Sequence, residues 1–139
     1  MYSYVLLAAT ALIVAIFLTP QRHKVWTATG IIATAAGGAL WLAVRTFLEG
    51  EIVIARFTTP LFGEESLVAD PLTSLFLAII SVAGIATVIY SRGYVESYLK
   101  RYSPAHISLH YTALTLLVVS MMLVVLSSGG FSFLFSWEL

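Results

Sequence analysis

The chain contains no cysteine, and its charged residues are few. Without cysteine it forms no disulfide, binds no iron–sulfur cluster and carries out no thiol chemistry. Only 10% of its 139 residues are charged, against about 25% in a soluble domain. Seven basic and seven acidic residues leave a net charge of zero, which argues against a nucleic-acid partner.

Patterns typical of metal sites and enzyme active sites are also missing. The three histidines, His23, His106 and His110, lie in or beside predicted loops, and none has a second ligand at metal-binding spacing. No pairing of a nucleophile with a base is visible in the sequence. We therefore expect no metal site and no cofactor bound by this chain.

Long apolar runs dominate what is present. The chain is 60% hydrophobic, with a mean hydropathy of +0.96. The runs are too long for barrel strands, so they predict transmembrane helices, which satisfy their own backbone hydrogen bonds in lipid. The N-terminus lacks the basic segment of a cleavable signal peptide, so we expect the first helix to remain as a membrane span.

The sequence predicts an all-α membrane protein with four complete transmembrane helices and the start of a fifth. The predicted spans are residues 2–19, 25–47, 71–90 and 108–126, followed by a segment that begins at Phe131. A basic turn, residues 21–24, separates the first two spans. Gly93 suits the C-terminal cap of the third span. His110 lies in the first turn of the fourth span, where either an interfacial position or a proton-relay role would explain it.

An acidic segment between the second and third spans predicts a small extramembrane β-hairpin. Residues 51–57 are β-prone, residues 58–63 supply the turn, and residues 65–68 form the returning strand. Asp70 then suits the N-cap of the third span, and Pro71 suits its first helical position.

Two stripes of small residues predict faces on which helices pack closely. On the second span, Gly30, Thr34 and Gly38 recur at four-residue spacing. On the third span the corresponding face consists of Ser74, Ser81, Gly84 and Ser91.

The charges of the loops predict the orientation of the helices. Residues 21–24 and 92–101 are mainly basic, whereas residues 49–70 are mainly acidic. Because basic loops stay in the cytoplasm, we expect the N-terminus and the hairpin to be extracytoplasmic. We expect Arg45, near the hairpin end of the second span, to extend its charge to the interface. The predicted location is the cell inner (cytoplasmic) membrane.

Residues 131–139 form an apolar, aromatic run with one carboxylate, Glu138. At about 1.5 Å per residue, Glu138 lies about 10 Å along a helix from Phe131, and about 16 Å along if the helix begins nearer Ser127. An ionised acid in hydrocarbon costs at least about 2.5–3.5 kcal/mol unless it is protonated, paired or hydrated. Those are also the conditions for proton transfer. The alternative is a tail along the interface, with Glu138 beside a solvated terminus.

Four segments carry a resemblance to a known family, namely residues 70–76, 90–94, 120–126 and 133–139. Together they resemble the antiporter-like proton-translocating subunits of respiratory complex I. That family includes the multisubunit cation/proton antiporters and the membrane arms of energy-converting hydrogenases. The final Ser-Trp-Glu-Leu is most similar to the hydrogenase branch, which includes hydrogenase-4 component B and the formate hydrogenlyase membrane subunit.

The resemblance implies a role for Glu138 in the proton pathway. In the family, the fifth-helix glutamate pairs with a lysine on the seventh helix beside a central, water-lined polar axis. Separating such a pair in a low-dielectric site destabilises the charged lysine and releases its proton. Because family members continue for many more helices, residues 1–139 are expected to be the N-terminal part of a longer subunit, whether truncated, split or a fragment.

Two functions follow from these observations. The first is translocation of protons or other cations, coupled to redox chemistry in an NADH:quinone oxidoreductase-like or hydrogenase-type complex. Its partners would be other membrane subunits of that complex and the lipid bilayer. The alternative is a small four-span membrane scaffold or assembly protein without transport chemistry, in which the glycine-containing faces bind partner helices.

Overall fold

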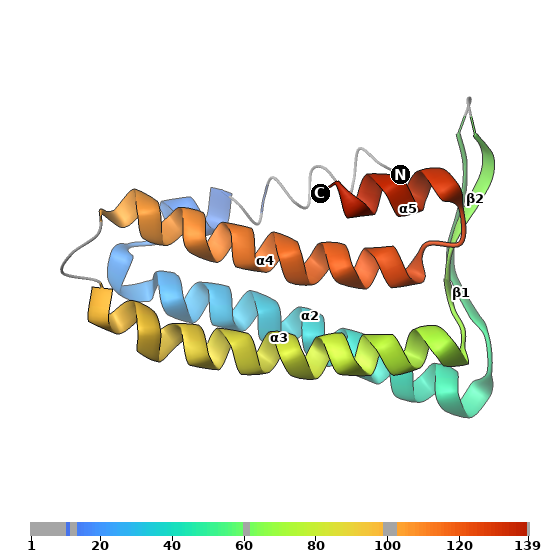
Figure 1. The fold of residues 1–139 in the computed structure, drawn as a ribbon, viewed down its shortest axis with the longest axis horizontal. Helices are drawn as coiled ribbons and strands as arrows, with labels where there is room; N and C mark the ends of the chain where they lie inside the picture. Colours follow the sequence, from blue (N-terminus) through green and yellow to red (C-terminus); the bar gives the residue numbers. More distant parts are fainter. Residues whose placement is uncertain (1–10, 12–13, 60–61, 99–102, 139) are drawn as a thin grey trace.

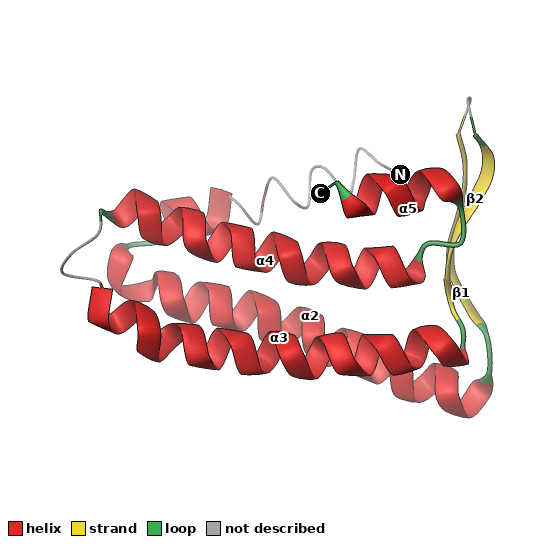
Figure 2. Ribbon diagram, in the orientation of Figure 1, coloured by secondary structure: helices red, strands yellow, loops and turns green. Residues whose placement is uncertain are grey.

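The computed structural model describes residues 11, 14–59, 62–98 and 103–138 (Figure 1). Its helices and strands, in chain order, are α2 (Gln21–Glu49), β1 (Ile52–Thr59), β2 (Gly63–Ala69), α3 (Pro71–Tyr98), α4 (Pro104–Leu126) and α5 (Gly130–Trp137). The long helices α2, α3 and α4 form a bundle, and the β1–β2 hairpin stands across one end of it (Figure 2). The short helix α5 lies beside α4.

Three helices are long and apolar enough to cross a membrane: His23–Glu49, Pro71–Val95 and Pro104–Leu126. Large apolar side chains are exposed on them, including Trp41, Ile79 and Leu117. Such surfaces suit lipid, which solvates apolar groups, better than water. The chain is therefore a mainly helical membrane protein. The first predicted span, residues 2–19, falls largely outside the described residues.

The helices extend further than the sequence predicted. Helix α2 begins at Gln21, so the basic turn is the first turn of the helix, and α4 begins at Pro104, which places His110 in its second turn. The predicted cap at Gly93 was wrong, because α3 continues to Tyr98. A glycine inside a helix costs about 1 kcal/mol relative to alanine. Beyond Gly93, Val95 is buried in an apolar cluster, which favours continuation of the helix.

The predicted hairpin is confirmed. Strands β1 and β2 pair antiparallel, with Phe57 opposite Glu65 and a bulge near Val53. Gly63 begins β2 with a φ of 76°, a value that glycine adopts without strain. The predicted cap at Asp70 is also confirmed, because its Oδ1 accepts the N–H of Thr73 at 2.6 Å.

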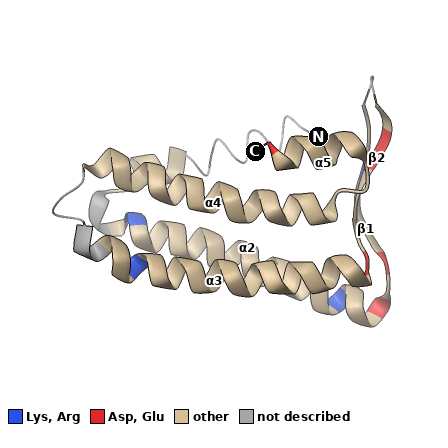
Figure 3. Cartoon of the chain, viewed as in Figure 1, with Lys and Arg blue, Asp and Glu red and all other residues tan. Residues whose placement is uncertain are grey.

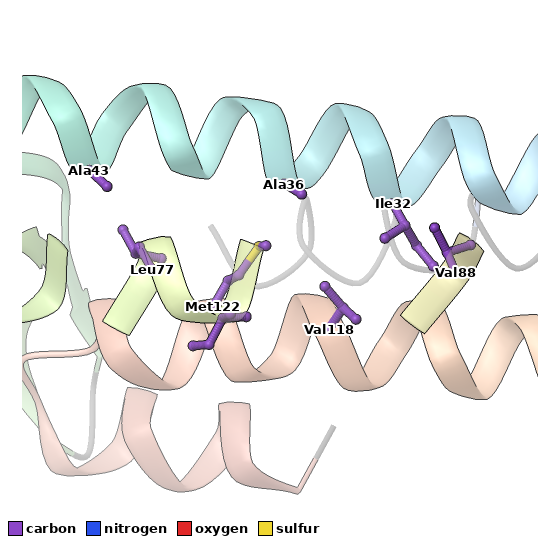
Figure 4. Close-up of a cluster of buried hydrophobic side chains, with 8 residues drawn as sticks. Ile32, Ala36, Ala43, Leu77, Val88, Val118 and Met122 are labelled. Carbon is purple, nitrogen blue, oxygen red and sulfur yellow. The ribbon is translucent and has the colours of Figure 1, made fainter. Parts of the chain in front are cut away.

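An apolar cluster fills the space between α2, α3 and α4 (Figure 4). It consists of Ile32, Ala36, Ala43, Leu77, Ile80, Val88, Val118 and Met122. The predicted packing face of α3 lies against these helices, and all four of its residues are buried. A side chain at Gly84 would have its Cβ 3.1 Å from Cγ1 of Val118. Gly84 is therefore a point of close approach between α3 and α4.

The predicted packing face of α2 is exposed instead. Gly30, Thr34 and Gly38 are all exposed, and a Cβ added at either glycine would meet nothing within 4 Å. The opposite face, with Ile32 and Ala36, is the one buried in the bundle. Within the described residues, the expected close packing of this stripe is therefore absent.

Candidate functional site

Helix α5 carries Glu138, the predicted site residue, and runs back along the bundle from the hairpin end. Figure 1 shows α5 running beside α4 from the hairpin end and ending near the middle of the bundle. Its buried residues are Ser132 and Ser136, whose small side chains permit close packing. Glu138 keeps helical backbone angles, and its N–H donates to the carbonyl oxygen of Leu134 at 3.1 Å. It therefore lies about 12 Å along the helix from Gly130.

The side chain of Glu138 is exposed. It forms no hydrogen bond or ion pair with any residue that the structure describes. On the other side of α5, the two serines occupy the buried face. Glu138 therefore faces outward from the described bundle. None of the basic side chains that the structure describes contacts Glu138, so the basic partner implied by the resemblance is not among them.

Apart from Glu138, the acidic side chains that the structure describes lie at one end of the bundle (Figure 3). The basic residue Arg56, on β1, lies at the same end. The hairpin end carries the acidic residues Glu49, Glu51, Glu64, Glu65 and Asp70. Lys24 and Arg92 lie at the opposite end. Arg45 lies at the hairpin end, where its Nε is 2.9 Å from Oε2 of Glu49 and its guanidinium lies over the ring of Trp41. Glu138 is apart from both groups of charges.

Lys24 is buried, with only 4% of its surface exposed. Its Nζ donates to the carbonyl oxygens of Ile16 and Phe17 at 3.1 and 3.0 Å, and to Oγ of Ser108 at 2.6 Å. The hydroxyl of Ser108 donates to Pro104, so it is free to accept from Lys24. Three acceptors match the three N–H groups of an ammonium. Sequence reasoning placed Lys24 in a basic turn and missed this tertiary role.

His110 joins α4 to α3. Its Nε2 lies 3.0 Å from Oγ of Ser91, a buried residue, and its ring meets that of Tyr111 edge-on. His106 lies 2.8 Å from Oγ of Ser103 through its Nδ1. The described residues contain no group of three or more histidines and acids able to hold a metal ion.

The interior of the described bundle contains separate hydroxyl groups rather than a row of titratable side chains. The hydroxyls of Thr46, Ser81 and Thr112 are buried without a hydrogen-bond partner among the described residues. Buried polar groups of this kind are usually satisfied by water. Leu77 and Val118 lie in the same interior. The described interior therefore contains apolar side chains as well as polar ones.

Glu65 binds the start of α5. Its Oε1 accepts the N–H of Phe131 at 3.1 Å, and its Oε2 accepts the N–H of Ser132 at 2.8 Å. Glu65 is 6% exposed. The pKa of this carboxyl lies below its ordinary value because the Ser132 hydroxyl and the N–H groups of Ser132 and Phe131 stabilise its charged form, an effect that burial opposes.

Glycine at position 129 makes room for this contact. A Cβ at Gly129 would collide with the Glu65 carboxylate, whereas a Cβ at Gly130 would meet nothing within 4 Å. Sequence reasoning missed the role of Glu65. The two ends of the contact are 66 and 67 residues apart, and no local pattern joins them.

No protein-family model matches the chain, and no curated protein matches it.

Proposed function

We propose that the chain is the N-terminal part of a membrane subunit that translocates protons or other cations, with Glu138 as a carboxylate of the ion pathway. Partner subunits would carry the redox chemistry that drives transport. In this proposal the chain contributes four complete transmembrane helices and the start of a fifth. Its N-terminus and hairpin are extracytoplasmic, and the membrane is the cell inner membrane.

The position of Glu138 on α5 carries the proposal. Helix α5 enters from the hairpin end and runs beside α4. This course takes Glu138 about 12 Å from the start of the helix, which is more than a third of the way across a hydrocarbon core of about 30 Å. A carboxylate at that depth is expensive unless a partner or water stabilises it.

Proton transfer through Glu138 requires a second titratable group, a base close to its carboxylate. Because Glu138 faces outward from the described residues, its partner would come from a helix packed against the outer side of α5. A base in that position would share a low-dielectric site with Glu138, so the charge on one would control the protonation of the other. Changing their separation would then move a proton.

The proposal is tested by replacing Glu138 with glutamine in the assembled complex. We expect Glu138→Gln to abolish or severely lower proton translocation, because the amide cannot ionise. Translocation and electron transfer are measured together in membrane vesicles, and assembly is checked by recovery of the complex. Glu64→Gln, at an exposed glutamate on β2, is the matched control. Wild-type translocation in an assembled Glu138→Gln complex would contradict the role of Glu138.

The exposed stripe of α2 favours the alternative function. Gly30 and Gly38 leave open space against which a partner helix can pack closely, as a membrane scaffold or assembly protein requires. Further apolar spans with single lysines near their centres, encoded downstream of Leu139, would favour translocation over this alternative. Normal translocation in the Glu138→Gln complex would favour the scaffold.

A further inference from the structure

The connection between α4 and α5 is bound to the hairpin along its length. The N–H and hydroxyl of Ser128 both donate to the carbonyl oxygen of Ser66, at 3.0 and 2.8 Å. Ser127 forms a β-bridge with Leu67. Strand β2 therefore holds the two residues that precede the turn into α5.

The first turn of α5 depends on the same strand for its cap. Gly129 is the N-cap residue and has no side chain to accept a backbone N–H. The carboxylate of Glu65 accepts two of the N–H groups that would otherwise lack partners there. Its negative charge also lies at the positive end of the helix dipole. An acid on the hairpin thus replaces the local cap that the helix lacks.

An aromatic contact adds to this attachment. The rings of Phe62 and Phe131 are stacked, with their centroids 4.6 Å apart. Phe62 precedes β2, and Phe131 lies in the first turn of α5. The start of α5 is therefore held by β2 through the Glu65 carboxylate, the Ser66–Ser128 contacts and this ring pair.

We propose that Glu65 is a positioning residue for Glu138: by binding the start of α5, it sets the direction of this helix and the place of the carboxylate at its other end. The inference rests on the proposed function of Glu138. Because α5 has only eight residues, a tilt at its start is transmitted directly to Glu138. The hairpin would then influence transport without touching the transported ion.

Two substitutions that break the contact in different ways test the proposal in the full chain. Glu65→Gln removes the charge and one acceptor. Gly129→Ala keeps the carboxylate but displaces it, because the new Cβ takes its place. Glu64→Gln and Gly130→Ala are the controls, at an exposed glutamate on the same strand and at a glycine with open space around it.

The first measurement is hydrogen–deuterium exchange of the protein in lipid nanodiscs. We expect the N–H groups of Phe131 and Ser132 to exchange at least about fivefold faster in Glu65→Gln and Gly129→Ala. The controls should exchange as the wild type does. Adding Gly129→Ala to Glu65→Ala should change the exchange much less than adding it to the wild type does, because no carboxylate is left to displace. Unchanged exchange at both residues in both variants would overturn the proposal.

The second measurement follows the position of α5 directly. The chain has no cysteine of its own, so spin labels can be attached at Leu134→Cys and Leu117→Cys, two exposed sites on α5 and α4. We expect the distribution of distances between the labels to broaden or shift in Glu65→Gln and Gly129→Ala and to stay unchanged in both controls. An unchanged distribution in both variants would contradict a positioning role.

Transport measurements separate this inference from the proposed function. We expect Glu65→Gln and Gly129→Ala to lower translocation severalfold in assembled complexes. If Glu138→Gln abolishes translocation while both of these variants translocate normally, Glu65 has no positioning role and the proposed function stands. Normal translocation in Glu138→Gln would overturn the proposed function instead. Exchange and label distances would then still decide whether Glu65 positions α5.

Discussion

Three charged side chains bind the ends of helices. Asp70 accepts an N–H at the start of α3, and Glu65 accepts two at the start of α5. Lys24 donates to the carbonyl oxygens of Ile16 and Phe17, in the helical residues 14–18 that precede α2. Acids at N-terminal ends and a base at a C-terminal end match the sign of the helix dipole. Each charge also replaces a missing partner of the helix backbone.

Asp70 gives a prediction about pH. The N–H of Thr73, followed by its hydroxyl, holds the pKa of Asp70 below its ordinary value. The pKa of Asp70 is lower in the folded protein than in the unfolded chain, so the ionised carboxylate stabilises the fold at any pH above the ordinary pKa. That stability is lost as the pH falls through the pKa of the folded state. We expect the wild type to lose stability between about pH 5 and about pH 2, and Asp70→Asn to lose less over this range.

The measurement is the midpoint of thermal unfolding of the purified protein in nanodiscs as a function of pH. At neutral pH, Asp70→Ala should lower the free energy of unfolding by about 1 kcal/mol, the usual value of an N-cap. Asp70→Asn should cost less than this, since asparagine also caps helices. An Asp70→Asn variant with the same pH dependence as the wild type would contradict the assignment.

At the scale of helices, Gly84 decides how closely α3 approaches its neighbours. An added Cβ would lie 3.1 Å from Cγ1 of Val118 on α4 and 3.8 Å from Cγ2 of Ile32 on α2. We expect Gly84→Val to lower the free energy of unfolding by about 1–3 kcal/mol through overpacking. Gly37→Val, on the exposed side of α2, should lower it by much less.

Denaturant titration in mixed micelles measures both variants. Combining Gly84→Val with Val118→Ala should recover part of the loss, because the smaller side chain frees the space that the new methyl groups need. Equal losses in Gly84→Val and Gly37→Val would show that helix propensity, rather than the α3–α4 contact, determines the effect.

For the whole molecule, the separation of charge predicts an orientation in the membrane. We propose that the hairpin is extracytoplasmic, because Lys24 and Arg92 lie at the other end of the bundle and basic residues favour the cytoplasmic side of a membrane. The absence of cysteine permits a direct test. In intact cells, a membrane-impermeant maleimide should label Thr58→Cys on β1. It should label Ser103→Cys, at the opposite end, only after permeabilisation. The reverse pattern would contradict the proposed orientation.

Features whose physical cause is local were predictable from the sequence. Apolar runs long enough to cross a membrane predicted the helices, because lipid leaves the backbone no other partner. Asp70 caps a residue three positions away, and the β-prone segments around Gly63 form a hairpin with a short connection. The buried face of α3 followed from its helical repeat. Glu138 was noticed as a single acid in an apolar run, but its role in the ion pathway comes from the resemblance and stays a prediction.

The remaining features depend on contacts between distant segments. The stripe on α2 has the small residues of a packing face, but the side with Ile32 and Ala36 is the one that packs in the apolar cluster of the bundle. Lys24 is buried because α4 brings Ser108 to it across 84 positions. Glu65 caps α5 because β2 pairs with the connection before that helix. A sequence pattern reflects the conformational preferences of neighbouring residues. Contacts between distant segments form only when folding brings separate helices and strands together.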